Sequence, residues 1–564
     1  MSILPRIVPR YVLRAAILAA AMALSIGWCP LLSENCQWGK WMASILIMGI
    51  CLCMKGKHWR WSTMALLATW AWCQTADVTA GCWKTQHAAW GMACIAIFHA
   101  TQGIYPKKWC RFVCISTCAI ATLLALRLCG MHFPWSIQLF NNPAGEAAAL
   151  ALGWSCCLPL LLPMAKPTEK CCLWKPLLAV SLGLLIVFLL YWRSRTGFLA
   201  VLLPTSFWLF PILRKRLRHA KWLYAIGAFA CLPLAFALYG RNADSADGRC
   251  LIYRSVWSLC TERPFCGWGS DAMQARYMAA QARMLSSEAN ARDAWLASDV
   301  THPFHEGLGW LLNYGLIGCV LLACAIVCII RETRTEYRYW LLCLCICWMV
   351  LSLFSYPSAY AYALLLFLGT IGTAVKGKST ENCSICTQKA NAWMKALVGL
   401  NLIFNFVAAR TEWHKERVLH FSANDHALLS HFKAMHETLH TNEACDYAYA
   451  AELNLSGHFQ ESQQLLSHLK GRMQNYDTEI LAADNALSLR HWSEAETHFT
   501  LAHQMVPVRF TPLYGLMQTY AQRGDTMQAR HTARLILHKR IKVNGAEVES
   551  IRQEARTLLA TPAR

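Results

Sequence analysis

Long runs without a charged residue recur along most of this 564-residue sequence and limit what it can fold into. A helix needs roughly 20 apolar residues to cross the hydrocarbon of a bilayer. Runs of about that length are Ala15–Ser33, Thr85–Pro106, Phe112–Leu126, Ala147–Ala165, Pro176–Trp192, Thr196–Leu213, Trp222–Gly240 and Gly307–Ile330. Tyr339–Val375 has room for two spans and is broken at Ser355-Tyr356-Pro357, because Pro cannot continue a helix. Shorter candidates are Trp41–Met54, Trp61–Gln74 and Ala396–Ala409. The sequence therefore predicts an all-α polytopic membrane protein with about 13 transmembrane helices.

The composition supports this prediction and excludes nucleic acid as a partner. Apolar residues make up 56% of the sequence and charged residues 15%, whereas a soluble globular protein carries about 25% charged residues. The formal net charge is +21, which in a soluble chain suggests nucleic-acid binding. Here the basic residues stand in small groups between long uncharged runs, which is typical of a polytopic membrane protein.

The basic groups alternate along the chain and predict its topology. Every second loop is rich in Lys and Arg: Arg6, Arg10 and Arg14; Lys55, Lys57 and Arg60; Lys107, Lys108 and Arg111; Lys166, Lys170 and Lys175; Arg214, Lys215, Arg216, Arg218 and Lys221; Arg331, Arg334 and Arg338; Lys376, Lys378 and Lys389. Because cytoplasmic loops carry the excess of Lys and Arg, we expect a cytoplasmic N-terminus, and an odd number of spans then places the C-terminus outside. We interpret the first apolar run as a retained helix, because Trp28 precedes Cys29 where a lipoprotein cleavage site carries a small residue.

After about Arg410 the apolar runs stop and a repeat appears. Segments of similar composition begin at Gly457, Arg490 and Arg523, which are 33 residues apart. This is about the period of tetratricopeptide repeats, in which each repeat is one helix–turn–helix unit. We therefore divide the chain into a transmembrane domain, residues 1–409, with a large outer loop at about 241–305, and a soluble helical-repeat module, residues 410–564. An irregular helical tail is the alternative, and either form is an interaction or scaffold module.

Most of the 28 Cys residues lie inside the predicted spans, where a buried thiol behaves as a small apolar side chain. Cys383 and Cys386 form a single C-x-x-C pair in a predicted cytoplasmic loop, and no second pair completes a zinc site. Cys250, Cys260 and Cys266 lie in the outer loop, where an oxidising compartment permits one disulfide. The sequence does not say which pair, if any, forms it.

Two predicted outer segments are basic although the topology rule disfavours Lys and Arg there, and we place the active site in them. The first segment is the hairpin Arg193-Ser194-Arg195-Thr196-Gly197, and the second is the outer loop with the start of the following span. The second segment contains Asp247-Gly248-Arg249, Arg254 and Trp257, Pro264-Phe265-Cys266-Gly267-Trp268-Gly269, Asp299, His302-Pro303-Phe304-His305-Glu306 and Asn313-Tyr314-Gly315-Leu316-Ile317-Gly318. Asp-Gly at 247–248 and Gly-Trp-Gly at 267–269 are typical of turns. We therefore expect neither a metal at Asp244 and Asp247 nor a dinucleotide site.

The order and spacing of these motifs resemble the O-antigen ligase superfamily, which includes O-antigen polymerases and bacterial O-linking oligosaccharyltransferases. The matching residues are the S-R-T-G hairpin, G-R-x-x-x-x-R-x-x-W followed by P-x-x-G-x-G, and H-P-F-x-E with N-Y-G-L-I-G. Asn141-Asn142-Pro143-Ala144-Gly145 and Ser355-Tyr356-Pro357 resemble the branch that carries tetratricopeptide tails. The resemblance covers roughly residues 130–375 and departs from the ligases where Pro303, rather than Asn, follows His302.

The resemblance implies a bacterial inner-membrane enzyme that transfers a glycan from an undecaprenyl-diphosphate carrier to an acceptor on the periplasmic face, without metal or nucleotide. Guanidinium groups suit the diphosphate, because they are always charged and grip phosphate bidentately. We assign Arg195 and Arg249 to that role, with Arg193 and Arg254 as second choices. Arg193 and Arg195 also have a plain alternative as interfacial charges, and Arg254 has one as a surface charge of a helix.

The acceptor hydroxyl needs a base that titrates near neutrality, which His provides. We assign His302, because one helical turn would place Asp299 beside its ring as an orienting partner. Against that turn, Pro303 favours an extended conformation at His302. His305 and Glu306 rank second, and the alternative is that His302 only anchors the loop at the membrane surface.

Four functions share this pattern. A ligase uses a lipid acceptor, a polymerase uses a second lipid-linked glycan, and an oligosaccharyltransferase uses a protein hydroxyl, for which a protein-binding tail is suitable. A transporter of lipid-linked sugar is a different class, and transporters tend to carry ionisable residues near the bilayer midplane. The predicted spans hold almost none, which favours ligase-like transfer. The sequence leaves the sugar, the acceptor and the oligomeric state open.

Overall fold

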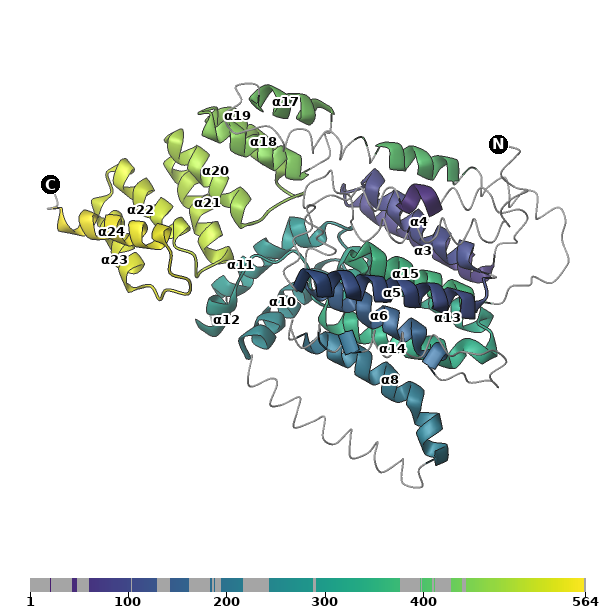
Figure 1. Cartoon of the computed structure of the whole chain (residues 1–564). Coiled ribbons are helices and arrows are strands. Elements are labelled where there is room, and N and C mark those ends of the chain that lie inside the picture. The colour runs from purple at the N-terminus through teal and green to yellow at the C-terminus, as the bar shows by residue number, and fades with distance from the viewer. Residues whose placement is uncertain are drawn as a thin grey trace.

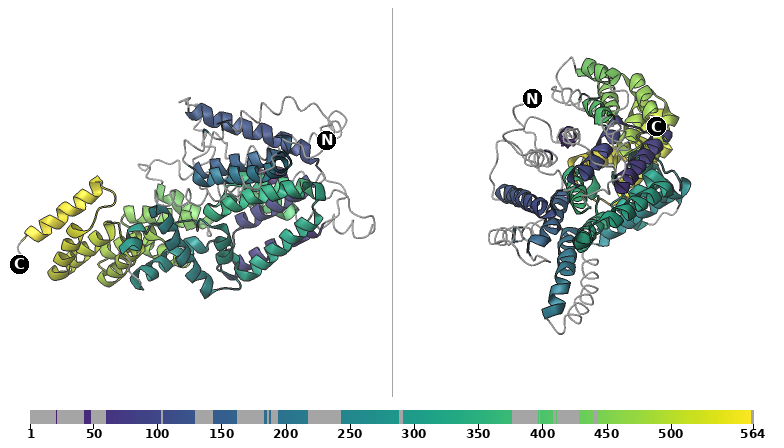
Figure 2. Two further views of the ribbon diagram at one scale, coloured as in Figure 1. Left: turned by 90° about the horizontal axis from the view of Figure 1, so that it is seen from below. Right: turned by 90° about the vertical axis from the view of Figure 1, so that its right-hand side faces the viewer.

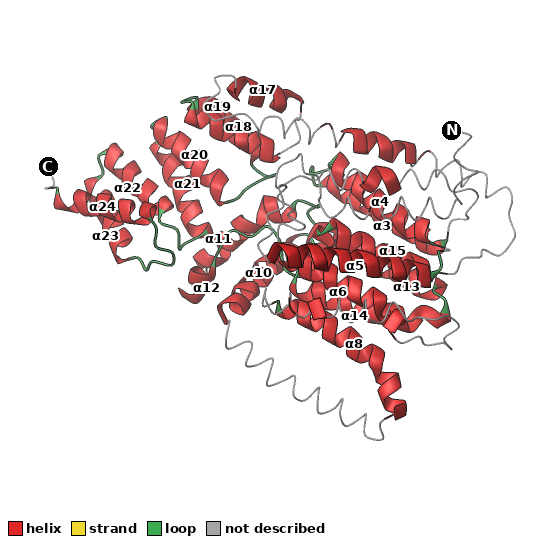
Figure 3. Cartoon of the chain, in the orientation of Figure 1, coloured by secondary structure: helices red, strands yellow, loops and turns green. Residues whose placement is uncertain are grey.

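The computed structural model describes residues 60–102, 104–128, 143–161, 194–216, 243–287, 291–375, 398–407, 428–438 and 443–561, with the positions 21, 43–47, 183, 184, 187, 396 and 410. Within these ranges all regular structure is helical, apart from one isolated bridge between Thr333 and Val375 (Figure 3). The prediction of an all-α chain is confirmed for this part. The predicted spans 15–33, 41–54, 176–192 and 222–240 lie largely outside the described residues, as do Arg193, Cys383 and Cys386.

In the described part of the chain, eight apolar helices form a bundle, and each coincides with a predicted apolar run (Figure 1). They are α3 (Trp61–Thr79), α4 (Thr85–Thr101), α5 (Pro106–Leu128), α6 (Pro143–Leu161), α8 (Arg195–Arg216), α13 (Glu306–Glu332), α14 (Arg338–Phe354) and α15 (Ala361–Ala374). Among the described residues, Pro106–Leu126, Glu306–Glu332 and Thr335–Phe354 are long and apolar enough to cross a membrane. Ala144–Leu160, Ala361–Ala374 and Val398–Val407 are shorter apolar helices. These helices support a membrane location, and the number of thirteen spans stays a prediction.

The predicted break between the last two long spans is confirmed. Helix α14 ends at Phe354, Ser355 is extended, and a short 3₁₀ turn (η4, Pro357–Ala359) precedes α15. Pro357 is the first residue of that turn, where its missing N–H costs no helical hydrogen bond. The break places Tyr356 and Tyr360 at the end of the bundle.

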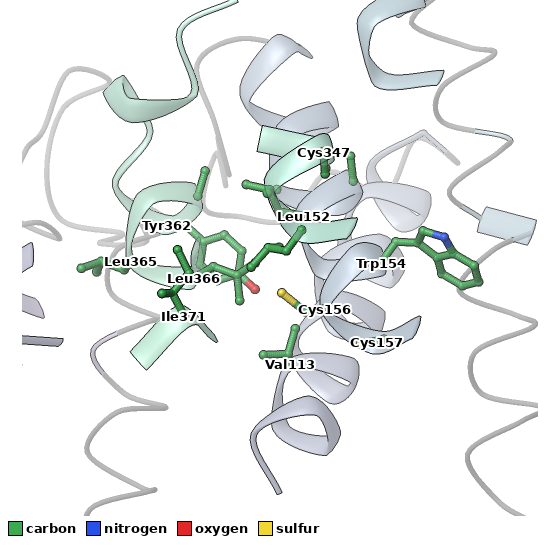
Figure 4. Packing of buried hydrophobic residues seen from close by; sticks show 14 of the residues in the cluster. Val113, Leu152, Trp154, Cys156, Cys157, Cys347, Tyr362, Leu365, Leu366 and Ile371 are labelled. Carbon is green, nitrogen blue, oxygen red and sulfur yellow. The ribbon is translucent and has the colours of Figure 1, made fainter. Parts of the chain in front are cut away.

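The core of the bundle is packed from small and branched side chains of α5, α6, α14 and α15. Figure 4 shows Val113, Leu152, Cys156, Cys347, Tyr362 and Leu366 meeting there. Every described cysteine is a free thiol, and those in this core are buried, as expected of a small apolar side chain. Cys250, Cys260 and Cys266 of the outer loop are also free thiols in the structure.

The outer loop is largely helical. It contains α10 (Ala243–Glu262), a π-helical turn (η2, Met273–Tyr277), α11 (Met278–Ser287) and α12 (Ala291–Leu296). The predicted Asp-Gly turn is wrong, because Asp247 and Gly248 lie inside α10. Asp244 and Asp247 instead lie 2.5 and 3.2 Å from the guanidinium of Arg292, and acidic side chains near a helix N-terminus are also favoured by the helix dipole.

The C-terminal tail is a row of helices, each packed on the next. They are α17 (Leu428–Thr438), α18 (Glu443–Leu455), α19 (Phe459–Leu469), α20 (Tyr476–Ser488), α21 (Trp492–Met505), α22 (Thr511–Arg523), α23 (Thr526–His538) and α24 (Ala546–Ala560). Gly457, Arg490 and Gly524 adopt left-handed backbone conformations between paired helices, at φ of 81°, 61° and 85°. Helical hairpins thus recur with the spacing seen in the sequence, and their assignment as tetratricopeptide repeats stays a prediction.

The tail extends from the end of the bundle at which α10, α11 and α12 lie (Figures 1 and 2). Its residues Tyr476, Ala502 and Met505 belong to the same buried cluster as Ile252 and Val256 of α10. Nearby, the Lys84 ammonium lies 2.7 Å from the carboxylates of both Asp271 in the loop and Glu443 in the tail. The tail and the outer loop are therefore on one side of the bundle and share a core.

Candidate active site

Phe304 is the strained centre of the H-P-F-H-E segment. Its φ is 52°, which is rare for an aromatic residue and is typical of backbone that surrounding contacts hold in place at functional sites. The Arg249 guanidinium lies 5.4 Å from the Phe304 ring centroid, and the Tyr253 hydroxyl donates to the Phe304 carbonyl at 3.3 Å. Arg249 and Tyr253 are four residues apart on α10 and so share one helix face.

Tyr356 holds the same segment from the other side. The His302 ring stacks on it with the centroids 4.2 Å apart and the planes 20° apart, and the Phe304 ring meets it edge-on at 5.5 Å. Tyr356 in turn stacks on Tyr360 at 5.6 Å. Helix α6 begins against Tyr360, since a Cβ on Gly145 would lie 2.6 Å from that ring. Three motifs that are far apart in the sequence therefore meet at one end of the bundle.

Asp299 does not lie one helical turn from His302, because residues 297–305 form no helix. The expected geometry is wrong, and Pro303 gives the physical reason, since it disfavours the α conformation at His302. Asp299 instead faces the tail. Burial and the nearby Asp477 raise the pKa of Asp299, and Arg509 opposes that rise. The His302 ring instead stacks on Tyr356.

His305 and Glu306 begin α13 and are engaged there. His305 is the N-cap residue, and its Nδ1 accepts a hydrogen bond from the backbone N–H of Leu308 at 3.2 Å. The Glu306 carboxylate accepts from the backbone N–H of Ser358 at 2.6 Å. Each side chain thus satisfies a backbone donor, and His305 as a base at Nδ1 would have to give up the cap.

The described arginine candidates have different environments. Arg195 is the first residue of α8, whose N-terminal end lies toward α10 (Figure 1). Ser194 caps that helix by accepting from the Gly197 N–H at 3.2 Å. Arg254 lies 2.8 Å from the buried Asp293 carboxylate of α12, so its charge is compensated inside the loop. Arg249 contacts residues 302–306, here called the histidine segment, through the Phe304 ring.

Residues 264–269 of the outer loop and residues 312–316 of α13 are joined by backbone hydrogen bonds, an arrangement called the clasp below. Trp268 and Gly269 donate to the carbonyls of Leu312 and Asn313, both at 2.9 Å, and Leu316 donates to Pro264 at 2.8 Å. The predicted turn at Gly267-Trp268-Gly269 is confirmed, with φ of 72° and 83° at the two glycines. Gly315 breaks the regular φ/ψ of α13, with φ 64° and ψ −169°, and so frees the groups that make the clasp. The clasp fixes the outer loop to α13.

Among the described residues, no three or more His, Cys, Asp or Glu side chains lie close enough together to hold a metal ion. Two charged side chains near His302 contact protein groups: Arg249 contacts the Phe304 ring, and Glu306 accepts from the Ser358 N–H.

Residues 180–323 match the model of a protein family described as O-antigen ligase. This match supports the O-antigen ligase superfamily. The matched segment contains Arg195, Arg249, Arg254, Asp299, His302, His305 and Glu306. No curated protein matches the chain. Members of the O-antigen ligase family are membrane enzymes of glycan assembly, so the match and the apolar helices together support a membrane glycosyltransferase.

Residues outside the O-antigen ligase match complete the cluster. Tyr356 and Tyr360 come from the break between α14 and α15, and Gly145 comes from α6. Sequence reasoning noted their motifs but gave Tyr356 no role, and it also missed Tyr253. A signal was present, because Ser-Tyr-Pro stands at the same predicted outer face as the His302 motif.

Proposed function

We propose that this chain transfers a glycan from an undecaprenyl-diphosphate carrier to an acceptor hydroxyl on the periplasmic face, as an O-antigen ligase-like enzyme of the bacterial inner membrane. The observation that carries this proposal is the cluster around Phe304, in which an arginine and a histidine of the matched family region are held at one end of an apolar bundle. A lipid-linked donor reaches such an end from the bilayer.

The chemistry assigns one role to each side chain. His302 takes the proton of the acceptor hydroxyl as its oxygen attacks the anomeric carbon of the glycan. The bond from that carbon to the diphosphate oxygen breaks, and undecaprenyl diphosphate leaves with the electron pair. Arg249 and Arg195 stabilise the negative charge that develops on the leaving oxygen, and such stabilisation is typically the largest contribution to catalysis. Arg193 and Arg254 are the second choices, and Asp299, His305 and Glu306 support the loop.

Tyr356 supports the proposed role of His302. A ring stacked at 4.2 Å has little freedom to turn, and a base that is already oriented loses less entropy when the acceptor binds.

The tail favours an acceptor that is recognised outside the membrane. It shares a core with the outer loop. We therefore place both residues 410–564 and the outer loop in the periplasm, and we place the N-terminus in the cytoplasm. Tetratricopeptide-like hairpins commonly offer an extended surface to a partner, which suits a protein partner or a protein acceptor.

The acceptor class is tested by reconstitution. Purified full-length protein in lipid nanodiscs is supplied with undecaprenyl-diphosphate-linked oligosaccharide and, separately, with lipid A core, a second lipid-linked glycan, or a Ser-rich protein. Transfer to lipid A core indicates a ligase, the class proposed here. Transfer only to the second glycan indicates a polymerase, and transfer only to protein indicates an oligosaccharyltransferase. In sealed vesicles, movement of the donor across the bilayer without transfer to any acceptor would indicate a transporter and overturn the proposal.

A further inference from the structure

Gln281 of α11 is a buried polar side chain that joins three segments of the chain. Its exposed fraction is 1%. Its Oε1 accepts from the Tyr277 hydroxyl at 2.6 Å, and its Nε2 donates to the carbonyls of Ser298 at 3.2 Å and of Met505 at 2.8 Å. The three partners belong to the π-helical turn, to the segment that leads into His302, and to the tail.

Each donated bond satisfies a carbonyl that regular structure leaves without a partner. Met505 is the last residue of α21, and the final carbonyls of a helix have no intrahelical donor. Ser298 lies in the non-helical stretch 297–300. Because a buried carbonyl left without a donor costs about 1–3 kcal/mol, the amide of Gln281 holds the end of α21 and the Ser298 backbone in one fixed relation.

The surrounding apolar core reaches from the tail to the strained phenylalanine. Tyr277, Met505 and Val506 belong to one buried cluster, and the partly buried Val300 and Phe304 pack against it. A displacement of α21 is therefore felt along residues 298–304 through both the hydrogen bonds and the packing. The tail therefore supports the backbone of residues 298–304 directly.

We propose that Gln281 is a positioning residue, through which the docked tail holds His302 and Phe304 in the geometry that transfer requires. This inference rests on the proposed function for its effect on rate, and its structural part is independent of the reaction. It predicts that the tail controls turnover itself, in addition to any choice of acceptor.

The structural part is tested by hydrogen exchange on the full-length protein in nanodiscs. In Gln281→Leu, which keeps most of the side-chain volume but no polar atom, backbone amides of 298–305 should exchange at least ~10-fold faster, because the Ser298 anchor is lost. Amides of α14 and α15 should be unchanged. The control is Gln474→Leu, which removes a glutamine whose side chain bonds Glu479 inside the tail. Equal exchange of 298–305 in the two variants would overturn the inference.

The rate is tested in the same preparations. Gln281→Leu should lower kcat for transfer by roughly 10–100-fold, the size expected of a small misplacement of a catalytic group, with the KM for the lipid-linked donor within ~2-fold. Gln474→Leu should match the wild type. A rise in donor KM with kcat unchanged would overturn the positioning role. If Gln281→Leu does not accumulate, Tyr277→Phe decides, since it removes one of the three bonds and should shift exchange and kcat in the same direction by less.

Failure of the proposed function and failure of the positioning role of Gln281 give different results. A wild-type protein that transfers glycan to no acceptor contradicts the proposed function, whereas the exchange comparison still decides whether Gln281 couples the tail to residues 298–305. An active wild type with an equally active Gln281→Leu contradicts only the positioning role.

Discussion

Arg249 is the side chain on which the proposed leaving-group chemistry depends most. Arg249→Ala should lower kcat by about 10²–10³-fold, because it removes a donor aimed at developing charge. Arg249→Lys should recover only part of the loss, since the planar fork is gone. The measurement is glycan transfer in nanodiscs at saturating donor. The control is Arg283→Ala, which breaks an exposed pair with Glu262 worth at most about 1 kcal/mol. Full activity of Arg249→Lys would contradict bidentate binding of the diphosphate.

The two histidines are expected to differ in kind. His302→Ala should abolish transfer with normal membrane insertion, because it removes the proposed base. His305→Ala should keep much of the activity and lose about 1 kcal/mol of stability, because it removes the cap on α13. His305→Asp should restore the stability, since a carboxylate also caps the N–H of Leu308. Transfer rates and thermal melting of the three variants separate the roles. An inactive His305→Ala beside an active His302→Ala would assign the base to the other ring.

Single residues show where sequence reasoning succeeds. The turns at Gly267 and Gly269 were predictable because glycine chemistry acts locally. The helical turn from Asp299 to His302 was not formed, because Pro303 and packing against the tail decide that backbone. Asp247-Gly248 was also misjudged, since its partner Arg292 is 45 residues away. Tyr356 was noted only as part of a helix break, and its stack on His302 depends on how two spans are placed side by side.

The clasp between α13 and the outer loop makes Gly315 intolerant of a side chain. A Cβ there would lie 2.1 Å from the Phe265 carbonyl oxygen, and the positive φ adds about 1–3 kcal/mol of strain. Gly315→Ala should therefore release the loop, with a lower folded yield and loss of transfer. Gly399→Ala is the control, because its Cβ meets nothing within 4 Å. Size-exclusion profiles in detergent and transfer rates measure the effect. A fully folded, active Gly315→Ala would show that the clasp is dispensable.

Helix α21 carries a histidine that should make the tail sensitive to acid. Burial, with a smaller contribution from Lys539, lowers the pKa of His503 to about 4 from its ordinary 6.5. The unfolded tail therefore binds this proton more readily than the folded tail, and stability falls as pH drops from about 6.5 toward 4, by roughly 2 kcal/mol at pH 5. His503→Leu should remove this loss. Hydrogen exchange of α21 amides at pH 5 and 7.5, corrected for intrinsic rates, measures it.

The control for that experiment is His531→Leu on the exposed side of α23. It should leave the pH dependence of α21 unchanged. If His503→Leu and the wild type lose the same protection at pH 5, the acid sensitivity has another origin.

The helical elements were largely predictable and their assembly was not. Apolar runs located α4, α5, α6, α8, α13, α14 and α15, because a bilayer demands length and uniform apolarity. The 33-residue spacing likewise located the tail hairpins through Gly457, Arg490 and Gly524. The core that joins Ile252 to Met505 spans about 250 residues of sequence, and no local period records a contact of that range. The sequence therefore indicated where the tail begins but not that it packs on the outer loop.

Across the whole molecule, the apolar bundle, the clasped loop and the docked tail all converge on the end where His302 stacks on Tyr356. The most direct measurement is the release of undecaprenyl diphosphate from glycan-loaded carrier, together with glycosylated acceptor, by purified protein in nanodiscs. The wild type should form both products in equal amounts, Arg283→Ala should match it, and His302→Ala should form neither above background. Equal product from His302→Ala and the wild type, or no product from the wild type with any acceptor, would contradict glycan transfer at this site.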